Sequence, residues 1–155
     1  MKKFLSLLLI VCMCFSLVAC GTEYEDTNGE EDFTLQTITD EEIINLGTGA
    51  SGLTYTEKHL GNTIYSSEYS SKNFNGVEQI YLTNFIGASD VSVYIGHMSV
   101  ESGNFKLVAV NNDEIIHEFD LDTFGETFYF EDLTGSFSIH VAGESAVFEF
   151  HIEIQ

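Results

Sequence analysis

The chain has 155 residues and a formal charge of −20, because 25 Asp and Glu residues outnumber 5 Lys and Arg. Binding to nucleic acid depends on Lys and Arg contacts with phosphate, so this composition argues against nucleic acid as a partner. Pro and Trp are absent, and the turns must therefore come from Gly, Asn, Asp and Ser.

The first 19 residues have the composition of a secretory signal peptide. A basic start, Met1–Lys3, precedes an apolar stretch from Phe4 to Ala19. The stretch has about 16 residues, whereas a membrane-spanning helix needs roughly 20. We expect residues 1–19 to be a signal peptide; an uncut membrane anchor and ordinary secretion are the alternatives.

The end of this leader reads LVAC, residues 17–20, followed by a glycine. The motif resembles the lipobox of bacterial lipoproteins. This resemblance implies cleavage between Ala19 and Cys20, a diacylglyceryl group on the Cys20 sulfur, and a mature chain at the extracytoplasmic face of the cell membrane. Two or more acyl chains anchor a protein stably. Cys12 and Cys14 would leave with the leader, so the mature chain would form no disulfide.

Residues 20–52 are predicted to form an acidic flexible tether. The run GTEYEDTNGEED has too few apolar side chains to offset the entropy of ordering. Further along, Thr39 and Glu42 match a capping box, and Gly47 is a natural stop. These signals predict a short helix over 40–46, which would be marginal alone.

From Leu53 onward the apolar residues alternate with a period of two. Short strands separated by turn signals predict an all-β class for residues 53–155, an antiparallel β-sandwich of jelly-roll or Ig-like type with about eight or nine strands. The expected strands are 53–58, 62–71, 77–87, 90–102, 104–111, 114–121, 126–131, 135–142 and 145–154.

Two local devices are predicted within this pattern. Met98 and Val100 fall out of phase with the preceding apolar residues, and a bulge at Gly96-His97 would restore the phase. Asn111 to Glu114 is typical of a hairpin turn.

The last two expected strands are predicted to form a hairpin with each other. Gly143-Glu144 suits a two-residue turn with glycine first. That register would place Ser136 opposite His151.

From Asn75 onward the chain also contains SGNFKLVAV, a polar turn, and GSFSIHVAGESAVFEFHIEI near its end. This pattern resembles small β-sandwich domains of lipoproteins from low-GC Gram-positive bacteria. The resemblance implies a fold and a location. It implies no reaction.

Five histidines are candidates for metal binding or acid–base chemistry: His59, His97, His117, His140 and His151. No H-E-x-x-H motif occurs. The predicted hairpin would separate His140 and His151 by about 13 Å along the strand, too far to share a zinc ion. His117 lies in phase with Ile115 and Phe119, so we expect it to be partly buried.

No cofactor is expected from the sequence, with calcium as the possible exception. The segment DLDTFGE offers Asp120, Asp122 and Glu126 as oxygen ligands. It lacks the full spacing of a calcium-binding loop, and Asp-rich turns are also ordinary loop chemistry. The segment is therefore interpreted either as a calcium site or as a plain turn.

An aromatic face is the remaining candidate site. Tyr65 and Tyr69 share a strand face with Ser67 and Ser71, and such a face can bind a sugar or a protein. An edge strand of a sandwich has the same pattern.

No catalytic motif stands out. G-x-S-x-G is absent, and carboxylates are too numerous for one pair to be distinctive. We therefore expect a non-enzymatic binding or assembly module of the cell envelope, whose partner is an envelope protein or a glycan. A carbohydrate- or Ca²⁺-dependent binding module is the alternative, and an envelope hydrolase is the least favoured.

Overall fold

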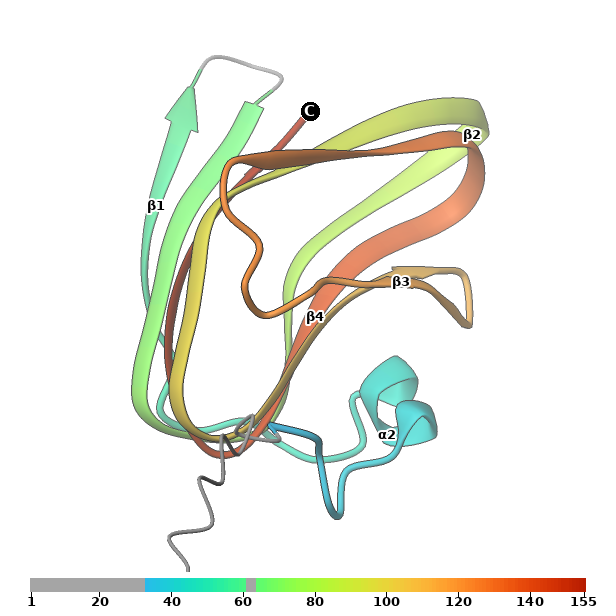
Figure 1. The fold of residues 1–155 in the computed structure, drawn as a ribbon. Helices are drawn as coiled ribbons and strands as arrows, with labels where there is room; N and C mark the ends of the chain where they lie inside the picture. The colour runs from blue at the N-terminus through green and yellow to red at the C-terminus, as the bar shows by residue number, and fades with distance from the viewer. Residues whose placement is uncertain (1–32, 61–63) are drawn as a thin grey trace, which may run out of the picture. The chain divides into compact units, whose positions relative to one another are not determined.

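The computed structural model describes residues 33–60 and 64–155 (Figure 1). Its elements are α2 (Asp40–Asn45), β1 (Thr54–Leu60), β2 (Ile64–Asn111), β3 (Glu114–Glu118) and β4 (Glu126–Ile154). All strand pairs are antiparallel, which confirms the all-β class. The expected signal peptide and Cys20 lie outside the described residues. No helix in the described part is long and apolar enough to cross a membrane.

The strands form two facing walls because β2 and β4 are long and bend from one wall into the other (Figure 1). The first wall contains β1, residues 64–71 and 91–100 of β2, and residues 126–130 and 147–154 of β4. The second wall contains residues 77–85 and 104–111 of β2, residues 135–144 of β4, and β3. Several strands that the sequence predicts separately are therefore continuous. The predicted strand over 114–121 ends earlier, at Glu118.

The main core lies between the walls, where alternate residues of each strand meet. Phe137, Ile139 and Val141 of the second wall are fully buried, as are Phe150 and Ile152 of the first. Their alternation in the sequence predicts this inward face correctly.

The predicted bulge at Gly96-His97 is confirmed. The register of β2 against β4 shifts between Ile95 and His97. As a result Ile95 and Met98 are both buried, with 0% and 7% of their surface exposed. The hairpin turn after Asn111 is also confirmed, because Asn111 pairs with Glu114.

The predicted hairpin at Gly143-Glu144 is wrong, since β4 runs through this point without turning back. Gly143 pairs with Gly76 on one side and with Phe105 on the other. A Cβ atom on Gly143 would lie 2.6 Å from Cδ1 of Phe74. This glycine is therefore required for close packing of a neighbouring ring, and the turn signal is misleading.

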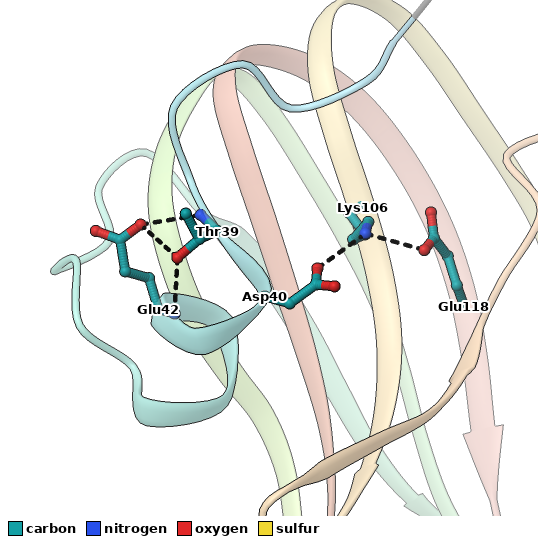
Figure 2. Close-up of polar contacts among 5 residues, drawn as sticks. All are labelled: Thr39, Asp40, Glu42, Lys106 and Glu118. Carbon is teal, nitrogen blue, oxygen red and sulfur yellow. Dashed lines mark hydrogen bonds and ion pairs between the residues drawn. The ribbon is translucent and has the colours of Figure 1, made fainter.

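The helix α2 begins as the sequence predicts. The Thr39 hydroxyl accepts from the Glu42 N–H at 3.3 Å, and the Glu42 carboxylate accepts from the Thr39 N–H at 2.9 Å (Figure 2). Two orphan N–H groups are thereby satisfied. The helix ends at Asn45, and Leu46 follows in the left-handed conformation with φ of 52°.

Residues 33–52 are not a tether, which corrects the boundary predicted at residue 53. The described residues belong to one compact unit. Ile43 of α2 is fully buried in a second apolar cluster with Val77, Val108, Val110 and Ala142 on the outward side of the second wall. Apolar side chains in this segment find an apolar surface to cover, which offsets the cost of ordering it.

Glu144 fastens this segment to the second wall. Its carboxylate accepts hydrogen bonds from the backbone N–H groups of Gln36, Thr37 and Ile38 at 2.8, 2.6 and 2.9 Å, and from the Asn104 amide at 2.9 Å. Burial acts to raise the pKa of Glu144, but the hydrogen bonds to its charged form outweigh this and hold the pKa well below the usual range.

Two salt bridges of Lys106 also hold α2 to the second wall. Its ammonium group lies 3.1 Å from a carboxylate oxygen of Asp40 and 3.0 Å from one of Glu118 (Figure 2). Burial acts to lower the pKa of Lys106, but the hydrogen bonds and charges of these two carboxylates raise it. The ion pair therefore links the helix to both β2 and β3.

Candidate functional site

The outward side of the first wall carries a row of ionisable side chains. His97, His151 and Glu68 lie at one level across three adjacent strands, because His151 of β4 pairs with both of the others. The two imidazole rings face each other, with centroids 6.4 Å apart and planes inclined by 24°. We call these three residues the histidine row.

Each histidine of the row has a carboxylate neighbour. His97 Nε2 lies 3.9 Å from Glu68, and His151 Nε2 lies 3.5 Å from Glu153. The Ser66 hydroxyl is 3.2 Å from the same His151 nitrogen. The side chains of His97 and His151 are 37% and 19% exposed, so a solute can reach the row.

The bulge at Gly96 makes this arrangement possible. A Cβ atom on Gly96 would overlap Nδ1 of His151. The glycine therefore admits the His151 ring, while the bulge aims His97 outward beside it.

The contacts of His151 do not form a Ser-His-acid triad. Ser66 and Glu153 both lie against Nε2 of the ring. In a triad the acid orients the imidazole through the nitrogen opposite to the one that activates the serine. Here the opposite nitrogen, Nδ1, lies against Gly96.

A groove with a mixed polar and apolar lining lies beside the histidine row. Its volume is about 830 Å³, and it is open to solvent. Val147 and Phe148 contribute to the lining together with eight residues that carry hydroxyl, amide, ammonium or carboxylate groups: Ser51, Thr54, Ser70, Ser71, Lys72, Asn73, Glu101 and Glu149. The groove and the row share two strands, since Ser70 and Glu149 are two residues along from Glu68 and His151.

An exposed aromatic ring lies at the edge of the first wall, on the side that faces the core. Tyr55 of β1 pairs with Tyr69, their ring centroids are 5.9 Å apart, and Tyr55 is 59% exposed. Paired residues share one face of a sheet, so the ring lies on the opposite side of the wall from Ser70 and Glu149 of the groove.

The predicted binding face at Tyr65 and Tyr69 is wrong because it points inward. Tyr69 is 3% exposed and stacks on Phe150 with ring centroids 5.0 Å apart. Its hydroxyl bonds to that of Tyr65, and the Ile80 carbonyl oxygen lies 3.4 Å from the Tyr69 hydroxyl and 3.2 Å from the Tyr65 hydroxyl, so that it accepts from whichever of the two does not donate to the other. The two tyrosines do share one face, as predicted, but it is the core face.

The structure does not assemble the candidate calcium ligands. Asp120, Asp122 and Glu126 are all exposed, and Thr123 closes a turn by donating to the Asp120 carbonyl. Among the side chains that the structure describes, in residues 33–56 and 64–155, no group of three or more His, Cys, Asp or Glu is arranged to hold a metal ion. Residues 120–123 form a turn.

Two further histidines are held in apolar surroundings. His140 is 2% exposed under α2, where Nδ1 bonds to the Ile43 carbonyl at 2.8 Å and Nε2 has no partner. Burial lowers the pKa of His140 and outweighs the bond to the Ile43 carbonyl, which acts to raise it. His117 is partly buried, as predicted, and packs on Phe119 and Phe128 with ring centroids 4.8 Å away in both cases.

Sequence reasoning missed the histidine row and the groove. Both depend on strands that are distant in the chain, and the wrong hairpin had assigned His151 to Ser136. The bulge was the available signal, because a glycine next to an outward histidine leaves room for a ring from the adjacent strand.

Comparisons with known proteins give only distant matches. No protein-family model and no curated protein matches the chain. Among solved structures, a cupin domain from Bordetella pertussis Tohama I is similar at 11% identity, covering 67% of this chain and 92% of its own, with a TM-score of 0.38. An RmlC-like cupin protein from Desulfovibrio desulfuricans has 11% identity, coverages of 66% and 81%, and a TM-score of 0.33.

A cupin superfamily protein from Desulfitobacterium hafniense DCB-2 has 15% identity, coverages of 78% and 94%, and a TM-score of 0.32. At these scores the likeness carries no argument about a site or an activity.

Proposed function

We propose that this protein is a lipid-anchored, extracytoplasmic binding module of the cell envelope that works without catalysis. The observation that carries the binding role is the groove of about 830 Å³ on the first wall. The lipobox at residues 17–20 supports the location.

The anchor is tested by mass spectrometry of the protein purified from membranes. We expect a diacylglyceryl group on Cys20 and its loss in Cys20→Ala. Lipid found on the variant, or an unmodified Cys20 in the natural chain, would contradict the anchor and leave the groove proposal standing.

We infer that the ligand class of the groove is carbohydrate. Hydroxyl, amide and carboxylate groups supply the donors and acceptors that sugar hydroxyls need, and Val147 and Phe148 add an apolar part to the lining. Small-molecule sites commonly combine a concave surface with a few placed polar groups in this way.

The test is retention of the protein on insoluble envelope polysaccharide. Asn73→Ala and Glu149→Ala should weaken retention. Glu131→Ala is the matched control, because Glu131 is also exposed but does not line the groove. Equal retention of Glu149→Ala and Glu131→Ala would argue against a sugar in the groove.

The second candidate is assembly with an envelope protein through the same groove. A photo-crosslinking residue placed at position 72, inside the groove, would capture such a partner in cells, whereas one at the exposed Glu131 would not. A single protein captured only from position 72 would favour assembly over carbohydrate binding.

A further inference from the structure

We propose that His97 and His151 form a chelating site for one divalent transition metal ion, of the class that imidazole prefers: Cu²⁺, Ni²⁺ or Zn²⁺. The site is on the outward side of the first wall and is independent of the proposed ligand groove. It uses two imidazoles as protein ligands, and water completes the coordination.

The register brings the two ligands together. His97 and His151 are directly opposite each other on adjacent antiparallel strands. The Cβ atoms of such a pair lie about 4.5–5.5 Å apart, so both imidazoles can reach one ion at about 2.0–2.1 Å by rotating their side chains. The rings already face each other at 6.4 Å, and the fold holds their backbones in place.

The bulge places the two residues side by side, and the rings must then turn out of their stacked arrangement to share an ion. Because Gly96 has no side chain, the His151 ring lies directly against the bulged strand that carries His97. The Tyr94 ring packs against His151 from the same strand, with centroids 6.2 Å apart and planes inclined by 78°. The His151 ring is thus restricted on both sides, and fewer orientations need to be lost on binding.

The surrounding charge favours a cation. Glu68 lies 3.9 Å from His97, and Glu153 lies 3.5 Å from His151. Both carboxylates lie next to Nε2 of their histidine, so their negative charges are close to the position of a cation held by these nitrogens. The chain as a whole carries a formal charge of −20, which attracts divalent cations to its surface.

The ligand type selects the metal class. Imidazole suits Zn²⁺, Cu²⁺ and Ni²⁺, whereas Ca²⁺ and Mg²⁺ require several oxygen ligands. Cu²⁺ is the strongest probe, because divalent ions bind to such sites with affinities that peak at copper. Bound Cu²⁺ also reports its nitrogen ligands in electron paramagnetic resonance spectra.

The test titrates the full lipidated chain in detergent with Cu²⁺. We expect one tight site whose pulsed spectrum shows two imidazole nitrogens. His97→Ala and His151→Ala should each weaken binding by at least about 10- to 100-fold, the loss seen even for outer partners of metal ligands, and leave one imidazole in the spectrum.

His117→Gln is the matched control, because its Nε2 is buried and away from the row. It should keep the affinity and both imidazole signals. Circular dichroism of each variant verifies the fold, and His97→Gln provides a second, milder change at the more exposed position.

Three results would overturn the proposal: a spectrum with oxygen ligands only, an unchanged affinity in the double variant His97→Ala/His151→Ala, or loss of the signal in His117→Gln.

Discussion

His140 and His151 lie on the same strand, β4, and both point away from the main core, yet their surroundings are opposite. His140 is 2% exposed under α2, whereas the His151 side chain is 19% exposed beside a groove. Alternation along the strand is the same in both places. The difference therefore comes from what covers each wall.

The second wall is covered because its outward side is apolar. Val108, Val110 and Ala142 point outward there and pack against Ile43. In the first wall the outward positions hold Ser66, Glu68, Glu153 and their neighbours instead. A strand buried on both faces has a continuous apolar run, and LVAV at 107–110 is such a run, whereas FEFHIEI at the end of β4 alternates.

The largest expected change in stability is the difference between inward-facing and outward-facing residues of the first wall. Phe150→Ala should lower the free energy of unfolding by about 3–5 kcal/mol, because the ring is fully buried against Tyr69 and Phe148. Its neighbour His151→Ala should cost less than about 1 kcal/mol, as expected for a surface change. Urea denaturation measures both values, and equal losses would contradict the assignment of the two faces.

The next effect tests whether the second wall is truly covered. Ile43→Ala should cost about 2–4 kcal/mol, because Ile43 is the fully buried residue of α2. Leu46→Ala, at a position 40% exposed, is the control and should change stability little. A negligible loss of stability for Ile43→Ala would mean that residues 33–52 do not pack against the second wall.

Glu144→Gln tests the hydrogen bonds that hold residues 36–38 to the second wall. We expect a loss of about 1–2 kcal/mol near neutral pH, since the site is partly solvated and several bonds to a charged oxygen are weakened. The folded state holds the pKa of Glu144 well below its usual range. Its contribution is therefore present above the unfolded pKa of about 4.3 and is lost as the pH falls toward the lower folded pKa.

Thermal unfolding of Glu144→Gln across acid pH provides the measurement. The natural protein should lose stability more steeply below about pH 4.3 than the variant does. Parallel curves would contradict the role of this carboxylate.

The smallest effect distinguishes the two histidines of β4. Because burial lowers the pKa of His140, the unfolded state binds more protons than the folded state once the pH falls below about 6.5. Stability should therefore decline as the pH falls through this window. His140→Asn should reduce that decline, and His151→Asn, which retains His140, should keep it. Melting temperatures between about pH 7.5 and 5.5 test this, and an identical decline in His140→Asn would contradict it.

Local signals predicted the local structure well. The Thr39–Glu42 cap and the Gly96-His97 bulge each depend on a few neighbouring residues, and both are confirmed. The inward faces of β4 followed from strict alternation of apolar residues.

Long-range pairing was not predictable from the same signals. Gly143-Glu144 has the chemistry of a turn, but Gly143 makes room for Phe74 and Glu144 caps the backbone at 36–38. Both roles depend on segments distant in the sequence. The candidate site was not predictable for the same reason, because the contact between His97 and His151 depends on the order of the strands in the sheet.

The most direct test of the contrast between an open first wall and a covered second wall is carbethoxylation of histidine under native conditions, followed by mass spectrometry of each site. The account predicts that His97 is modified readily and that His140 stays protected until Ile43→Ala or urea releases the cover. Modification of His140 as fast as His97 in the native protein would contradict the account.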